Sequence, residues 1–289
     1  MNKIVQKMEK VAKDHGARFY LSTPVHSIIK NESLERANAI MIPSSDPEAG
    51  FVSKEYDLVV INADTTYAFK HLLGDLESFS GLESMNHTSS AIVFYWGFSQ
   101  VLTSLHGHNI FLAEEYSQSF DEIFGTGKEQ GKRGLPNQLS FYIHVPSRHD
   151  KTAAPPGRDS VMVLVPVGNL GLENSGSFYY GSPEEGKRDP ERAKLHSKIN
   201  TLVRHARTMV LDRLTRTTGI KHLESLILTE TVYDPLTWNY RFNLHAGSVL
   251  GLSHDILQVL SFRPHLRHGS LANVYFVGAS VHPGTASLY

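Results

Sequence analysis

Apolar residues recur along this chain with two different periods, one typical of helices and one typical of strands. Near the start they fall at helical spacing and precede a glycine suited to a helix C-cap, which predicts an amphipathic helix ending at Gly16. The residues at this spacing are Ile4, Val5, Met8, Val11 and Ala12. Residues 57–62 are almost wholly apolar, as is typical of a strand buried in a parallel sheet. A helix, short strands and a returning buried strand indicate the second half of a dinucleotide-binding domain.

Most of the rest of the chain is predicted to form short strands separated by turns. In the first part of the chain the predicted strands are 18–22, 25–30, 37–42, 51–53 and 57–62. From about Gly74 the runs become aromatic and alternating, and they cover 89–98, 109–113, 138–145, 160–167 and 225–231. A long helix is predicted over 189–217, and 247–263 is expected to be a loop leading to a short helix. The predicted fold class is α+β or α/β, with a partial Rossmann-like domain and a second domain of mixed or antiparallel sheet and helices.

The final seventeen residues carry the most specific pattern. An apolar β-type run, 274–277, ends at Gly278, passes small residues and reaches His282-Pro-Gly-Thr285. Glycine after a strand lets the backbone approach a flat or phosphorylated ligand closely. We therefore expect half of a ligand site in this part of the chain.

Composition narrows the class of partner. The 289 residues are 40% hydrophobic and 20% charged with a net charge of −1, which gives no electrostatic reason to expect nucleic acid. Since the sequence has no cysteine, disulfides, thiolate metal sites and a cysteine nucleophile are excluded. The apolar stretch 91–98 is too short to span a bilayer, and the charged start of the sequence does not resemble a signal peptide.

Other patterns favour ordinary structural roles. His106-Gly-His108 is the one tight pair among sixteen histidines, and no carboxylate lies near it at helical spacing, so no metal site is predicted. The Gly- and Lys-rich run 125–132 lacks the glycine spacing of a phosphate loop. Gly278-Ala-Ser-Val-His282 lacks the fifth-position glycine of a nucleophile elbow. The aromatic runs 94–98 and 141–145 suit a core, with the wall of an apolar ligand cavity as the alternative.

The run 275–285, Tyr-Phe-Val-Gly-Ala-Ser-Val-His-Pro-Gly-Thr, completes a set of motifs that includes 58–64 and segments within 145–168 and 234–264. Together they resemble the flavin-dependent phytoene desaturases of the bacterial and fungal type, especially the fungal branch, over essentially the whole sequence. The run 275–285 is similar to the family's C-terminal flavin-contact motif, and 58–64 resembles the strand that returns to the cofactor domain.

This resemblance implies an enzyme that binds FAD non-covalently and desaturates phytoene, a long apolar polyene, in carotenoid biosynthesis. The implied step is hydride transfer from the hydrocarbon to the flavin. The implied cofactor contacts are Val25 at the adenine and Gly278, Ala279, His282, Gly284 and Thr285 near the flavin. No residue is assigned as the catalytic base.

The resemblance also implies a division of the chain and a location. Residues 1–73 would form the second half of an FAD-binding domain, 74–265 a substrate-binding domain, and 266–289 a return to the FAD-binding domain. Relatives of this type are membrane-associated, so we expect a peripheral contact on the cytoplasmic side of a membrane, without secretion.

Two departures from the family pattern stand in the sequence. The family's Gly-x-Gly-x-x-Gly turn, which grips the FAD pyrophosphate, has no counterpart, and Ala286-Ser-Leu-Tyr289 stands where the family continues with Gly-Val-Pro. We therefore expect an incomplete form that binds FAD weakly. Two alternatives stay open: another flavin oxidoreductase of the amine oxidase-like superfamily, and an inactive remnant that binds an apolar ligand or a partner.

Overall fold

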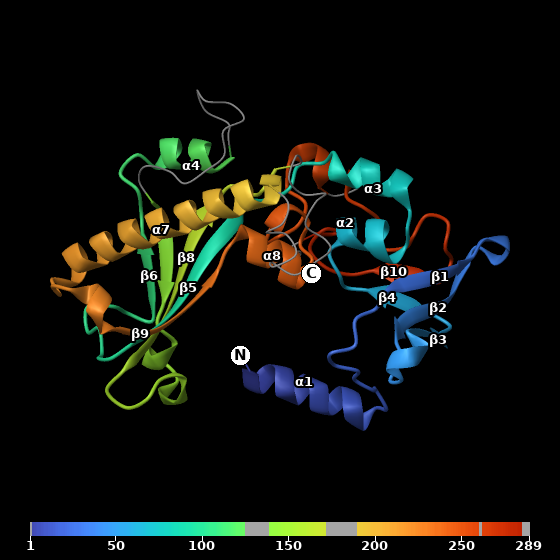
Figure 1. Ribbon diagram of the computed structural model, residues 1–289, viewed down its shortest axis with the longest axis horizontal. Coiled ribbons are helices and arrows are strands. Elements are labelled where there is room, and N and C mark those ends of the chain that lie inside the picture. Colours follow the sequence, from blue (N-terminus) through green and yellow to red (C-terminus); the bar gives the residue numbers. More distant parts are fainter. Residues whose placement is uncertain (1, 125–138, 172–189, 260–261, 285–289) are drawn as a thin grey trace.

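The computed structural model describes residues 2–124, 139–171, 190–259 and 262–284. Figure 1 shows an elongated molecule with a large sheet and a long helix at one end and two small sheets at the other. Helix α8 (Pro235–Phe242) lies between these parts, and helix α1 (Asn2–Asp14) lies apart from both (Figure 1).

The large sheet has five antiparallel strands in the order β6-β7-β8-β5-β9. In chain order they are β5 (Ser90–Phe98), β6 (His108–Phe111), β7 (Phe141–His144), β8 (Asp159–Val167) and β9 (Ile227–Tyr233). Helix α7 (Pro190–Thr218) crosses the sheet and packs Ala206, Val210 and Leu214 into its core (Figure 1). The aromatic strand residues are buried in the same core, as the sequence interpretation favoured, and they include Phe94, Trp96, Phe98 and Phe141.

The other end of the molecule is built on two small sheets. Strands β1 (Ser27–Asn31), β2 (Arg36–Pro43) and β3 (Phe51–Glu55) form an antiparallel meander. Strand β4 (Val59–Ile61) pairs in parallel with β10 (Val274–Phe276). The chain continues from β4 into α2 (Thr65–Tyr67), the π-helical turn Ala68–Leu72 and α3 (Leu76–Glu83), which cover one face of this pair and form a second apolar core.

The remaining described elements are short. Helix α4 (Tyr116–Phe124) stands beyond the large sheet (Figure 1). Single 3₁₀ turns cover Glu32–Leu34, Pro47–Ala49, Pro146–Arg148, Lys151–Ala153, Leu223–Leu226, His245–Gly247 and Ile256–Gln258.

Buried Asn273 joins the meander to the parallel pair. Its side-chain oxygen accepts the N–H of Ala37 at 2.8 Å, and its amide nitrogen donates to the carbonyls of Ala37 at 2.8 Å and Asp57 at 2.9 Å. Its own carbonyl accepts the N–H of Val59 at 2.9 Å. The side chain and the backbone carbonyl of this one residue together fix where β10 begins relative to β2 and β4.

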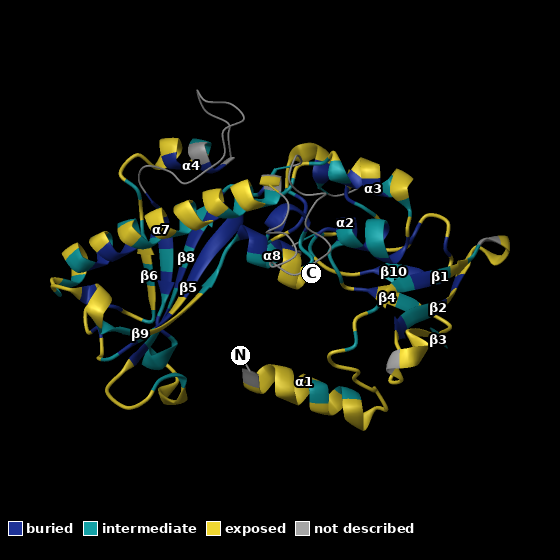
Figure 2. Ribbon diagram, viewed as in Figure 1, coloured by how far each residue is buried: buried dark blue, intermediate teal, exposed yellow. Residues whose placement is uncertain are grey.

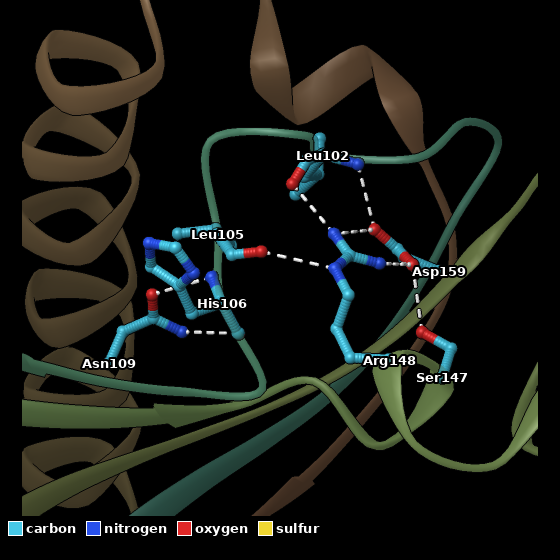
Figure 3. Close-up of polar contacts among 7 residues, drawn as sticks. All are labelled: Leu102, Leu105, His106, Asn109, Ser147, Arg148 and Asp159. Atoms are coloured by element: carbon cyan, nitrogen blue, oxygen red, sulfur yellow. Dashed lines mark hydrogen bonds and ion pairs between the residues drawn. The ribbon is translucent and has the colours of Figure 1, made fainter.

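An ion pair closes one end of the large sheet (Figure 3). Arg148 donates through both terminal nitrogens to the buried Asp159, which also accepts from Ser147 Oγ at 2.7 Å and from the N–H of Leu102 at 2.7 Å. Arg148 further donates to the carbonyls of Leu102 and Leu105 at 2.7 and 3.1 Å. Burial alone would raise the pKa of Asp159, but these hydrogen bonds outweigh it and hold the pKa below its ordinary value.

The expected strand at 18–22 is wrong as a ladder strand, because no described strand lies beside it to pair with it. Its last residue, Ser22, has φ 54°, and Pro24 has no N–H to donate, so β1 begins only at Ser27. Val25 consequently precedes the strand that was expected to carry it. The expected strand over 57–62 keeps only Val59–Ile61 in the ladder. Over 247–263, where a loop leading to a short helix was expected, the short helix is a single 3₁₀ turn at Ile256–Gln258.

Candidate functional site

The carboxyl ends of β4 and β10 lie side by side and define the candidate site. Val59 pairs with Val274 and Ile61 with Phe276, and the N–H of Val277 extends the ladder to the carbonyl of Ile61 at 2.9 Å. The chain after each strand therefore leaves at the same edge. Ligands of open α/β sheets bind outside this edge, because parallel strands direct their following loops there.

Residues 278–284 form a turn after β10 that we call the terminal bend. Gly278 and Gly284 have φ of 124° and 107°, a backbone conformation that side chains other than glycine rarely adopt. A Cβ added at Gly278 would lie 3.2 Å from the side-chain oxygen of Asn62, directly after β4. Gly278 and His282 are exposed while Val281 is buried, so the bend is anchored from inside and open outside.

A fully buried arginine holds the terminal bend from below. Arg263 is 1% exposed and makes five hydrogen bonds, all to backbone carbonyls. Two reach Ala279, and the others reach Ser253 at 3.0 Å, Gln258 at 2.9 Å and Leu252 at 3.0 Å. The five N–H donors of a guanidinium match this set. Burial lowers the pKa of Arg263, which stays a cation at neutral pH.

Three further contacts join the bend to the preceding loop. Ser280 Oγ accepts the N–H of Leu252 at 3.1 Å, and the N–H of His282 donates to the carbonyl of Pro264 at 2.8 Å. Gly251 has φ 71°, and a Cβ there would lie 2.0 Å from Ser280 Oγ, so only glycine fits beside that hydroxyl. The loop and the bend thus form one packed unit.

A carboxylate with an altered pKa stands just after β4. Asp64 is the N-cap of α2 and accepts the N–H of Tyr67 at 2.9 Å. Burial raises the pKa of Asp64 to about 6, against the lowering effect of hydrogen bonds from the N–H groups of Tyr67, His245 and Thr66. His245 belongs to the turn that follows α8, so Asp64 ties the end of β4 to the centre of the molecule.

Two histidine rings pack against each other close to helix α2. His245 is fully buried, and its ring centroid lies 4.5 Å from that of His87. Burial lowers the pKa of His245 to about 3, and the positive charges of His87 and Lys70 add to this effect. His87 lies 3.4 Å from the hydroxyl of Thr66 and 3.0 Å from the carbonyl of Met85. His245 is therefore neutral at physiological pH.

The site residues expected from the sequence fall into three groups. Gly278, Ala279, His282 and Gly284 lie together in the terminal bend. Thr285 lies outside the described residues. Val25 is half-buried and packs against the apolar core that also contains Phe276 and Val281, and its role at an adenine stays a prediction.

Sequence reasoning missed Arg263, Asp64 and His245 as parts of the site. The Arg263-Pro264 and Asp64 positions lie within motifs that carried the family resemblance, so a signal for them was available. His245 had no such signal, because its importance comes from burial beside residues distant in the chain.

The tight histidine pair lies far along the chain from this site. The ring of His108 stacks on His144 at 4.8 Å and lies 5.9 Å from that of His149. Over the residues that the structure describes, no group of three or more histidine, aspartate or glutamate side chains is arranged to hold a metal ion. Within the same residues, no helix combines the length and the apolar character needed to cross a bilayer.

Comparison with solved structures gives the class of fold. An oxidoreductase from Methanosarcina mazei superimposes on 96% of this chain with a TM-score of 0.53 at 16% sequence identity, and the match covers 48% of that protein. The two share a fold, which agrees with the expected mixed α/β class and a partial Rossmann-like domain.

Sequence comparison then gives the particular relatives. The chain is 41% identical over 288 residues to the phytoene desaturase of Phycomyces blakesleeanus and 40% identical over 293 aligned residues to that of Neurospora crassa. Each alignment includes 98% of this chain and 44% of the relative, so the chain spans about half the length of the curated relatives it matches. The predicted resemblance to fungal phytoene desaturases is confirmed over nearly the whole chain. No family model matches the sequence.

Proposed function

We propose that this chain provides part of an FAD-dependent oxidoreductase that desaturates phytoene in carotenoid biosynthesis. The observation that carries the proposal is the glycine-containing terminal bend at the joined carboxyl ends of β4 and β10. The similarity to phytoene desaturases extends through this bend and supports the choice of substrate.

The residues present suit a flat cofactor. Gly278 and Gly284 leave two positions of the bend without a Cβ, and Ala279 between them is small, so a ring can lie against the backbone. At Gly284 a Cβ would approach Arg263 Nε to 3.3 Å and His254 Nε2 to 3.5 Å, so the bend also carries nitrogen groups close beneath it. Gly278, Ala279, His282 and Gly284, with Thr285, are the proposed flavin contacts, and Val25 the proposed adenine contact.

When bound, FAD would supply the acceptor for a hydride from the hydrocarbon. The residues of this chain would hold the ring and exclude water. The cation of Arg263, fixed under the bend, would favour negative charge that develops on a group above it. Phytoene has no polar handle, so its binding would rest on apolar burial, at about 25 cal/mol per Å².

We propose the same functional division as the sequence indicates, with 1–73 and 266–289 serving the cofactor and 74–265 the substrate. The core of the large sheet supports this division, since all its residues lie within 74–265. Helix α3 and Leu252, which also belong to 74–265, pack instead with the core that holds β4 and β10.

We also propose a peripheral membrane contact through the β6 edge of the large sheet and the neighbouring helix α4, on the cytoplasmic side. Apolar side chains are exposed there on β6, on the segment after it and on α4: Ile110, Leu112, Tyr116 and Phe120. Such side chains can enter the boundary between headgroups and acyl chains without spanning the bilayer.

A chimera tests the proposed function. This chain would replace the matched 44% of the Phycomyces relative, and the chimera would be expressed in a host that accumulates phytoene. The expected result is loss of phytoene with formation of desaturated carotenoids, seen by absorbance and chromatography. A chimera carrying Gly278→Val is the matched control and should bind less flavin. A folded chimera that retains FAD but leaves phytoene unchanged would refute the proposal.

A further inference from the structure

Helix α7 is far more basic than the rest of the chain. It contains seven lysines and arginines and two acidic residues, a net charge of +5, whereas the whole sequence has a net charge of −1. The residues outside this helix therefore carry a net charge of −6. Such a separation of charge within a nearly neutral chain favours an anionic partner at the helix.

Most of these cations are not used to hold the helix in place. Arg207 is an exception, since it forms ion pairs with Glu224 at 2.6 Å and with Glu230 at 3.0 Å. Over the residues that the structure describes, five other cations of α7 form no ion pair: Lys194, Lys198, Arg204, Arg213 and Arg216. Their charge is therefore available to a ligand.

A cleft of about 300 Å³ runs beside this helix. Its walls come from α7, from the segment after β6 and from the segment leading into β7, and its lining residues are Leu112, Ala113, Glu114, Leu139, Phe141, Met209, Asp212, Arg213 and Arg216. Leu139 and Phe141 are buried, so the inner part of the cleft is apolar, whereas Arg216 is exposed. An apolar cleft with two guanidinium groups suits an amphipathic molecule that carries a phosphate.

The charges of the cleft indicate where that phosphate comes from. Asp212 and Glu114 also line the cleft and offset the two arginines, so a free phosphate ion would gain little net attraction there. The remaining cations, Lys194, Lys198 and Arg204, are exposed along the helix outside the cleft. Attraction thus depends on many anions presented at once, as on an anionic membrane.

Exposed apolar side chains adjoin the same cleft. Leu112, which lines it, is 59% exposed, and Tyr116 and Phe120 are exposed on α4. Figure 2 shows exposed surface on α4 and along the outer side of α7. A nucleic acid would use the cations but would leave these apolar side chains in water. Cations beside exposed apolar groups are typical of the boundary between headgroups and acyl chains.

We propose that α7 and this cleft bind anionic phospholipids. The proposal rests on the peripheral membrane contact proposed above and adds the chemistry of the lipid. Arg213 and Arg216 hold the phosphate of one lipid, and Leu112 contacts the upper part of its acyl chain. Lys194 and Lys198 face the neighbouring headgroups and raise the affinity by about fivefold each.

Cosedimentation with lipid vesicles tests the proposal. This chain should bind vesicles of phosphatidylcholine mixed with phosphatidylglycerol about tenfold more tightly, or better, than vesicles of phosphatidylcholine alone, and added salt should weaken the binding. Lys194→Gln combined with Lys198→Gln should weaken it by about 25-fold. Lys7→Gln is the matched control: it removes an exposed cation from α1, which lies apart from both parts of the molecule, and should leave binding unchanged.

Two variants locate the lipid in the cleft. Arg213→Gln should weaken binding to the mixed vesicles by about fivefold. Leu112→Gln should weaken it by about tenfold, because apolar burial is lost, but should not change binding to a double-stranded RNA oligonucleotide. Leu112 is exposed and belongs to neither large apolar core, so its replacement leaves the fold intact.

Equal binding to both kinds of vesicle, no binding to either, or a loss in Lys7→Gln as large as that of the double variant overturns the proposal. So does binding to RNA that is tighter than binding to the mixed vesicles. If only Leu112→Gln weakens binding, the general membrane contact stands and the site for anionic lipid is refuted. The readout uses neither flavin nor phytoene, so its failure leaves the proposed desaturation untouched.

Discussion

Replacing Arg263 with lysine should destabilise the terminal bend by a calculable amount. Arg263 uses five N–H donors on four backbone carbonyls, and an ammonium group has three donors. At least two buried hydrogen bonds are lost, and each bond from a charged donor contributes about 1.5–3 kcal/mol. The expected loss in the free energy of unfolding is therefore about 3 kcal/mol or more, although the charge is retained.

Urea unfolding measures this loss, and hydrogen exchange locates it. The amide of His282, which donates to Pro264, should exchange faster in Arg263→Lys, because Arg263 holds both the bend and the preceding loop. The matched control is Arg216→Lys. Among the described residues the exposed Arg216 side chain donates to the carbonyl of Asp212 alone, so this change should alter stability by less than about 0.5 kcal/mol. If Arg263→Lys is as stable as the control, the buried guanidinium does not hold the bend and the reasoning fails.

Three further variants test other parts of the structure. Gly278→Ala should cost about 1–2 kcal/mol in urea unfolding because of the positive φ, and a neutral result would contradict the described bend. Asp64→Asn keeps the cap on Tyr67 but cannot ionise. The pKa of Asp64 in the folded protein, about 6, lies above the ordinary value, so the stability of the wild type falls as the pH rises from about 4 to 6. Urea unfolding curves at pH 4 and pH 7 should differ by on the order of 2 kcal/mol in the wild type. The variant should lose this difference. Asp159 has a lowered folded pKa, so its contribution is present above about pH 4 and is lost on acidification. Asp159→Asn should lower the free energy of unfolding by about 3 kcal/mol at pH 7 and should make stability depend less on pH in the acid range. If the variant and the wild type lose stability equally on acidification, the ion pair of Asp159 with Arg148 is contradicted.

The large sheet was predictable because its strands show a clear alternation of residues in the sequence. Strand β8 alternates buried and partly buried residues without interruption, and the sequence prediction differs from it by one residue at the start. Helix α7 was equally clear, since its apolar face repeats over many turns. In these elements local pattern and tertiary packing agree.

The site was predictable only in part. Glycines in the bend were readable, because few residues other than glycine adopt their backbone conformation. The parallel pairing of β4 with β10 was not readable, because both strands are short and distant in sequence. The same holds for Arg263, whose type usually marks a surface position and whose burial depends on four carbonyls brought together by folding.

The pairing of β4 with β10 also has a kinetic consequence. Val59 and its partner Val274 are 215 positions apart, so their contact closes a very long loop. The chain entropy lost in closing such a loop slows contact formation, whereas β5 and β8 meet over a much shorter separation. Folding should therefore complete the large sheet first and assemble the terminal bend last. A newly made chain would pass through a state with a finished core in the large sheet and an unformed terminal bend. If that bend is the cofactor site proposed above, flavin binding would report the final folding step.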